Sequence, residues 1–70
     1  MLLDYYKKNG NILVSIVLFP DYKNKQLLLE VKTHPPIECV EKTFDGGEYD
    51  KAIDFFNELV KKIDPDWVGN

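Results

Sequence analysis

The single cysteine, Cys39, and the single histidine, His34, are the residue types that form a nucleophile and its general base. A cysteine is nucleophilic as a thiolate, which needs an accessible and positively charged setting. Cys39 instead follows Glu38 and lies two positions before Glu41, and two prolines follow His34. One cysteine and one histidine are also too few ligands for a structural zinc site. We therefore expect no catalytic thiol and no metal site.

The stretch from Asp45 to Asp50 reads Asp-Gly-Gly-Glu-Tyr-Asp and comes directly before a predicted helix. Two glycines at the start of a helix can bind phosphate through backbone N–H groups. The three carboxylates of this stretch would repel such an anion. The regular oxygen spacing of a calcium-binding EF-hand loop is also absent from it. Turn formation and helix capping explain the stretch without a ligand.

Other catalytic arrangements find little support. Ser15 lies within a predicted strand, and no general base or oxyanion-hole motif accompanies it. Asp50 and Asp54, one helical turn apart, lie on the solvated side of the predicted helix. A chain of 70 residues has little room for a ligand cavity of even about 300 Å³. The sequence therefore predicts a protein that is not an enzyme and holds no cofactor.

The clearest predicted element is an amphipathic helix over residues 48–63, because apolar residues recur there at helical spacing. These residues are Tyr49, Ala52, Ile53, Phe56, Leu59, Val60 and Ile63. Acids near its start and lysines near its end suit the helix dipole. We expect Asp45 or Gly47 as the N-cap, and Asp64-Pro65 as the end of the helix.

Three segments before this helix are typical of strands. The first is rich in β-branched and aromatic residues, the second alternates between apolar and polar residues, and the third is shorter and more polar. They are Asn11–Phe19, Gln26–Thr33 and Ile37–Phe44. Residues 20–24 are expected to form a hairpin loop between the first two strands. His34-Pro35-Pro36 separates the second strand from the third.

Residues 2–8 allow two interpretations. Asn9-Gly10 is a hairpin signal, which makes 2–8 a strand that pairs with the next one. Gly10 also suits the end of a short helix. The strand is favoured because residues 2–8 have no N-cap. The predicted fold class is α+β, a small antiparallel sheet of three to four strands packed on one C-terminal amphipathic helix, in the order ββββα with αβββα as the alternative.

Length and composition narrow the class of protein. Residues 1–70 are expected to form a single compact α+β domain. One cysteine rules out an internal disulfide, which favours a reducing compartment. The first residues show no signal-peptide pattern, and the longest apolar run, Ile12 to Phe19, falls far short of the ~20 residues of a membrane span. We expect a cytoplasmic protein that does not interact with a membrane.

One helix covers only one face of a small antiparallel sheet. Strand alternation then turns several apolar residues toward the uncovered face. They are Leu13, Val17, Phe19 and Leu28, with Val40 or Phe44 as further candidates. Such a patch is typical of an interaction surface. The alternative is that the N-terminal segment or the tail covers it, since Trp67 and Val68 are expected to fold back on the edge of the core.

These features favour a non-catalytic protein-binding module or small inhibitor. It is expected to dock on a protein partner or on a second copy as a homodimer, through the open sheet face or an edge strand. All nine cations are lysine, and Asn, Ile, Asp and Tyr are frequent, which suggests an AT-rich coding genome. A phage or another mobile element is the source that we expect.

Charge supports two alternatives. Residues 38–58 hold seven acids and two lysines in a chain of net charge −3. An acidic nucleic-acid mimic would block a nucleic-acid-binding enzyme through Glu48, Asp50, Asp54 and Glu58. A weak nucleic-acid binder would use the lysines and tyrosines of the N-terminal half, namely Lys7, Lys8, Lys23, Lys25, Lys32, Tyr5, Tyr6 and Tyr22. The negative net charge and the lack of arginine argue against nucleic acid as the main partner.

Overall fold

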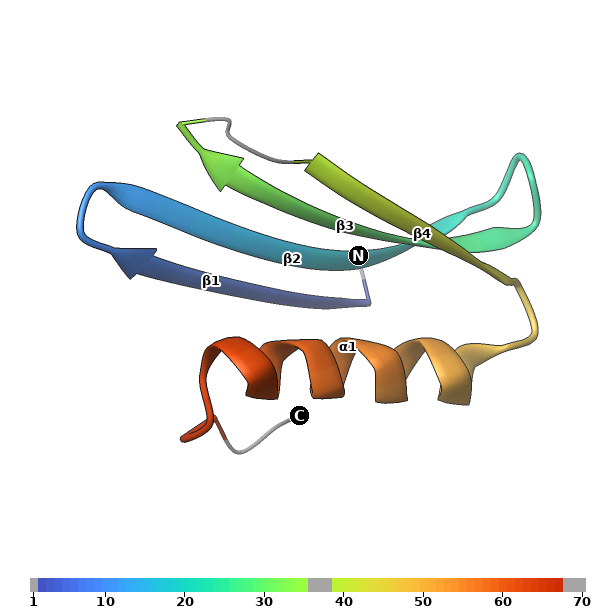
Figure 1. The fold of residues 1–70 in the computed structure, drawn as a ribbon. Helices are drawn as coiled ribbons and strands as arrows, with labels where there is room; N and C mark the ends of the chain where they lie inside the picture. Colours follow the sequence, from blue (N-terminus) through green and yellow to red (C-terminus); the bar gives the residue numbers. More distant parts are fainter. Residues whose placement is uncertain (1, 36–38, 68–70) are drawn as a thin grey trace.

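The computed structural model describes residues 2–35 and 39–67, which form one antiparallel sheet and one helix (Figure 1). The strands are β1 (Leu3–Asn9), β2 (Ile12–Asp21), β3 (Gln26–His34) and β4 (Cys39–Asp45), and the helix α1 spans Tyr49–Ile63. The strands neighbour one another in chain order, β1-β2-β3-β4. The predicted order ββββα is confirmed, and the alternative αβββα is wrong because residues 3–9 form a strand.

The hairpin between β1 and β2 has a two-residue loop, Gly10-Asn11, which joins the paired residues Asn9 and Ile12. Gly10 has a φ of 64°. Glycine reaches this left-handed region without steric cost because it has no Cβ. The hairpin signal at Asn9-Gly10 was therefore interpreted correctly.

Strand β2 continues through Pro20 and Asp21, where the sequence predicted a loop. The turn lies further on, at residues 22–25, and Lys25 has a φ of 54°. Proline ends a strand only where its missing N–H is needed for a ladder hydrogen bond. Strand β1 begins opposite Leu18, so no strand pairs with Pro20 on that side.

Helix α1 begins at Tyr49, with Glu48 as its N-cap in place of the predicted Asp45 or Gly47. Residues 45–48 form a turn before the helix, in which Glu48 N donates to Asp45 O at 2.9 Å. The Glu48 side chain accepts a hydrogen bond from Asp45 N at 3.1 Å. This turn moves the first helical residue one position beyond the prediction.

Of the third predicted strand, Ile37 and Glu38 lie outside the described residues.

The core lies between α1 and one face of the sheet. The sheet contributes Tyr5, Ile16, Leu18, Leu27 and Leu29, and the helix contributes Ala52, Phe56 and Val60. Figure 1 shows the helix running along this one face, where it contacts β2 and β3. The described residues contain no helix that is long and apolar enough to cross a lipid bilayer.

The two flanks of the helix differ. On the β1 flank, the segment after the helix folds back, and the ring of Trp67 meets those of Tyr5 and Phe56 edge to face, each at 6.1 Å. Asp64 accepts a hydrogen bond from the Tyr5 hydroxyl. On the β4 flank, the described residues leave a groove open. The prediction that Trp67 covers the edge of the core is confirmed, and Val68 lies outside the described residues.

Candidate functional site

The four apolar residues predicted for the uncovered sheet face lie together on it. We call this face, which points away from α1, the open face. Register and alternation place Leu13, Val17, Phe19 and Leu28 there, and each side chain is half-buried. Trp67 packs on the opposite side of the sheet and does not cover them.

Polar groups divide the open face into strips. Ser15 separates Leu13 from Val17 along β2 and is itself buried. The register brings the carboxylates of Asp4, Glu30 and Glu41 into the row of Val17. The apolar residues therefore form a narrow stripe beside charged groups, and the continuous apolar area is small.

Val40 and Phe44 were wrong candidates for this face. Val40 pairs with Val31 and Phe44 with Leu27, and residues paired across antiparallel strands share a face. Both side chains therefore lie on the helix side of the sheet. There the rings of Phe44 and Phe55 meet edge to face at 5.8 Å.

The four acids suggested for a nucleic-acid mimic lie in two different settings. Asp50, Asp54 and Glu58 are exposed on the outer side of α1. Glu48 precedes the helix, and its side chain forms an ion pair with Lys51 at 2.9 Å. Hydrogen bonding to Lys51, and then to the backbone of Asp45, lowers the pKa of Glu48 below its usual value of 4.5. Glu48 is therefore committed to the turn that starts the helix.

The lysines and tyrosines suggested for nucleic-acid binding do not converge. Lys7 and Lys8 lie near the β1–β2 hairpin, whereas Lys23 and Lys25 lie in the β2–β3 turn at the opposite end of the sheet (Figure 1). Tyr5 is buried in the core, so its ring is closed to stacking. Tyr6, Lys8 and Lys32 share the open face, where Tyr6 and Lys32 flank Ser15, but the other members of the set lie apart from them.

The candidate nucleophile and general base, Cys39 and His34, lie at neighbouring strand ends. Cys39 is exposed at the start of β4, and His34 is exposed at the end of β3. Within residues 2–35 and 39–67, no three His, Cys, Asp or Glu side chains are grouped so that they could hold a metal ion.

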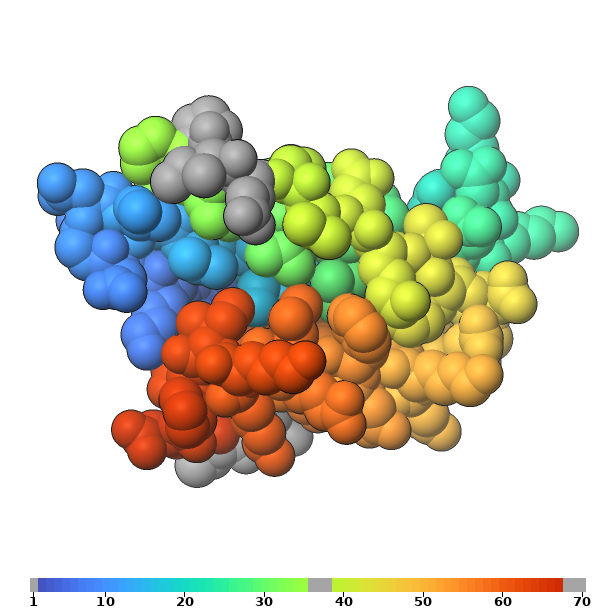
Figure 2. Space-filling view, in the orientation of Figure 1, coloured from blue at the N-terminus to red at the C-terminus, as the bar shows by residue number. Residues whose placement is uncertain are grey.

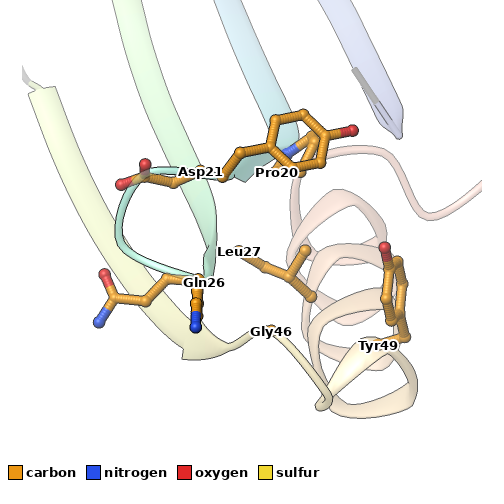
Figure 3. A pocket seen from close by; sticks show the side chains of 8 residues that line it. Pro20, Asp21, Gln26, Leu27, Gly46 and Tyr49 are labelled. Carbon is orange, nitrogen blue, oxygen red and sulfur yellow. The ribbon is translucent and has the colours of Figure 1, made fainter.

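A small hollow lies between the β2–β3 turn and the first turn of the helix. Its volume is about 140 Å³. Figure 3 shows Leu27 pointing from the sheet toward the helix, with Pro20 on the neighbouring strand and Tyr49 at the start of α1. Small-molecule sites usually exceed ~300 Å³. This hollow is too small to suggest a ligand.

A larger groove of about 460 Å³ runs between α1 and β4 on the helix side of the sheet. We call it the β4 groove, and its lining residues are Leu29, Val31, Val40, Glu41, Lys42, Phe55 and Leu59. In Figure 2 the yellow-green atoms of β4 lie above the orange atoms of the helix, with green atoms between them. Val40 and Phe55 are 53% and 37% exposed, more than any of the four predicted open-face residues.

Lys42 supplies the positive charge of the groove. Its Nζ lies 5.1 Å from the centre of the Phe55 ring and 5.4 Å from that of Phe44. Both distances suit a cation–π interaction, in which the ring faces attract the ammonium group. The amino group is thus held over the rings at the groove and forms no ion pair with a carboxylate of the described residues.

Hydrogen bonds at the end of β4 show which way its backbone groups point. Gly46 N donates to Lys25 O at 3.0 Å, so position 46 faces β3. Asp45 N points the other way, to Glu48 Oε1. Backbone direction alternates along an antiparallel strand. Even-numbered residues of β4 therefore bond to β3, and odd-numbered residues point outward.

The outer side of β4 consequently presents the backbone N–H and C=O groups of Cys39, Glu41 and Thr43. Among the described residues, β4 is the last strand of the sheet, and no other strand pairs with this edge. An unpaired edge accepts an additional extended chain through main-chain hydrogen bonds. The open edge and the apolar groove lie side by side, and together they form the candidate site.

Sequence reasoning missed Phe55 and Val40. Phe55 falls outside the apolar stripe of the helix, and an aromatic residue on the polar side of an amphipathic helix was the available signal. The position of Val40 was assigned to the wrong face because the register between β3 and β4 was unknown. In the observed register between β3 and β4, Val40 lies on the helix side of the sheet and lines the same groove as Phe55.

Neither a family model, a curated protein nor a solved structure matches this chain. Function is therefore inferred from the arrangement of the residues.

Proposed function

We propose that the chain is a non-catalytic protein-binding module that takes up an extended segment of a partner protein along the outer edge of β4. The observation that carries this proposal is the open backbone edge of β4 beside a groove that holds the exposed side chains of Val40 and Phe55. Edge pairing supplies affinity through the main chain, and pockets beside the edge select side chains. An inhibitor or regulator of a larger protein would use the same arrangement.

An extended segment fits this site better than a small molecule. The β4 groove is partly open to solvent, so a compact ligand would keep part of its surface in water, whereas binding sites bury most of a ligand. An added strand would bond to Glu41 and Thr43 and send every second side chain over the groove. The open face remains a second surface for a partner, although its apolar stripe is narrow.

We also propose that the protein is cytoplasmic. Cys39 is exposed and has no disulfide partner, since the chain holds one cysteine. Such a thiol persists in a reducing compartment. The test is expression with a fluorescent tag in its host cell, where a periplasmic or secreted location would contradict this assignment.

Selection from a library of random displayed peptides against the full chain tests the proposed function. We expect binding peptides whose addition shifts the amide NMR signals of β4 and of residues 55–59. Phe55→Ser and Val40→Thr should each weaken binding about tenfold or more, because they remove exposed apolar anchors. The thermal unfolding of Val40→Thr should change little, whereas that of Phe55→Ser should fall by a few degrees because the ring contact with Phe44 is lost.

Tyr6→Ser is the matched control, because Tyr6 is as exposed as Val40 but lies on the open face. It should leave peptide affinity unchanged. Loss of binding in Tyr6→Ser or Leu13→Asp, with full binding in Phe55→Ser, would assign the function to the open face. A failure to select any peptide would contradict the proposal.

A further inference from the structure

The charges of β4 bear on whether a second copy of this chain can occupy its edge. Two copies would pair their β4 strands antiparallel about a two-fold axis, with the outward residues meeting each other. Three registers pair five or more of the seven residues of the strand. Like charges directly opposite each other destabilise a sheet.

Each of these registers brings like charges together. The first places Glu41 opposite its own copy, and the second places Lys42 opposite its own copy. The third places Glu41 opposite Asp45 of the other copy. Edge charges of this kind are a common means of preventing a strand from pairing with itself. The edge therefore disfavours pairing with the β4 edge of a second copy while it stays open to a different sequence.

From this charge pattern we infer that the partner segment belongs to a different protein and carries a defined order of residues, an inference that rests on the proposed function. Opposite Lys42, on the groove side, lies an acidic residue. Next to it in the segment, opposite Glu41 on the open face, lies a basic residue. Opposite Val40 and Phe44 lie apolar residues, which extend over the groove. Opposite charges across a strand pair stabilise it.

The helix adds to the positive charge on the groove side. Lys62 follows Phe55 by seven residues, which is close to two helical turns and so places it on the same side of α1. Lys51 also lies toward this side, but Glu48 pairs with it at 2.9 Å. The groove thus offers Lys42 to an acidic side chain, with Lys62 further along the same side of α1, and the open face offers Glu41 to a basic one.

Two peptides of identical composition test this order. The core of the first, Leu-Thr-Glu-Lys-Leu-Thr, places Glu opposite Lys42 and Lys opposite Glu41 when it pairs antiparallel with residues 44–39. The second, Leu-Thr-Lys-Glu-Leu-Thr, exchanges the two charges. NMR titration of the full chain at low salt should give about tenfold tighter binding of the first peptide, and the difference should shrink at high salt.

A charge-exchanged chain, Glu41→Lys with Lys42→Glu, should reverse the preference and bind the second peptide more tightly. Because both side chains are exposed, its thermal unfolding should fall only slightly, through loss of the cation–π contacts of Lys42. Equal binding of the two peptides at β4, or a preference that does not reverse, would overturn the inferred order but leave the proposed function intact. Failure of these peptides and of every library-selected peptide to shift the β4 signals would overturn both. A concentration-dependent dimer that pairs through β4 would overturn the assignment to a different protein.

Discussion

The hydroxyl of Tyr5 donates a hydrogen bond to Oδ2 of Asp64 at 3.1 Å, which ties the first strand to the residue that ends the helix. Tyr5 is a buried member of the core, and Lys7 lies 4.0 Å from the same carboxylate oxygen. The ring of Trp67 packs against that of Tyr5. This contact holds the C-terminal segment against the β1 flank of the helix.

Tyr5→Phe should therefore destabilise the fold, because it removes the donor and keeps the ring. We expect the midpoint of thermal unfolding, measured by circular dichroism at neutral pH, to fall by a few degrees. Tyr6→Phe is the control, since Tyr6 is mostly exposed and should show no change. An unaltered midpoint in Tyr5→Phe would show that the hydrogen bond contributes nothing to stability.

Alkaline pH should weaken the fold through the same residue. Burial, followed by the hydrogen bond to Asp64 and its negative charge, raises the pKa of Tyr5 above the usual 10.0. A group whose pKa is raised in the folded state contributes stability that is present below pH 10.0 and is lost as pH rises through the folded value. Urea unfolding at a series of pH values should show this loss in the native chain and a smaller loss in Tyr5→Phe.

The two neighbouring glycines should respond differently to alanine. A Cβ on Gly46 would lie 2.8 Å from the carbonyl oxygen of Lys25, whereas a Cβ on Gly47 would meet nothing within 4 Å. We expect Gly46→Ala to lower the free energy of unfolding by about 1–3 kcal/mol, because two backbone segments must move apart. Gly47→Ala should stay within about 0.5 kcal/mol. Chemical denaturation of both variants checks this, and equal effects would contradict the close approach.

Proline in β4 should be tolerated at Thr43 and damaging at Lys42. The Thr43 N–H points outward, so its loss leaves the ladder to β3 intact, whereas the Lys42 N–H bonds to β3. Lys42→Pro should cost about 3 kcal/mol or more. Thr43→Pro should stay folded but lose peptide binding, since it removes an outer donor. Thermal unfolding and the peptide titration together check both expectations. An unfolded Thr43→Pro would show that the Thr43 N–H bonds to β3 and does not point outward.

Much of the fold was predictable because its signals are local. The spacing of Ala52, Phe56 and Val60 predicts which side of the helix is buried, and all three are fully buried. Asn9-Gly10 predicts a hairpin, and the alternation of residues 26–33 predicts a strand. Each of these patterns depends on neighbours within a few residues, so no tertiary information was needed.

The candidate site was less predictable because it depends on contacts that are remote in sequence. The face on which Val40 lies follows from its pairing with Val31, a register that no local pattern in the sequence determines. The sequence predicts a turn at Pro20, although its place beyond the start of β1 makes it acceptable in a strand. Phe55 becomes a groove residue only once β4 lies beside the helix.

The packing of Trp67 on Tyr5 and Phe56 has a practical consequence for optical measurements. Trp67 is the only tryptophan in the chain, and it lies on the flank of the helix opposite the β4 groove. Its fluorescence therefore reports on unfolding and on events at the β1 side. A ligand bound along β4 would leave the Trp67 emission nearly unchanged. An unchanged tryptophan signal during a titration would therefore be no sign that binding has failed.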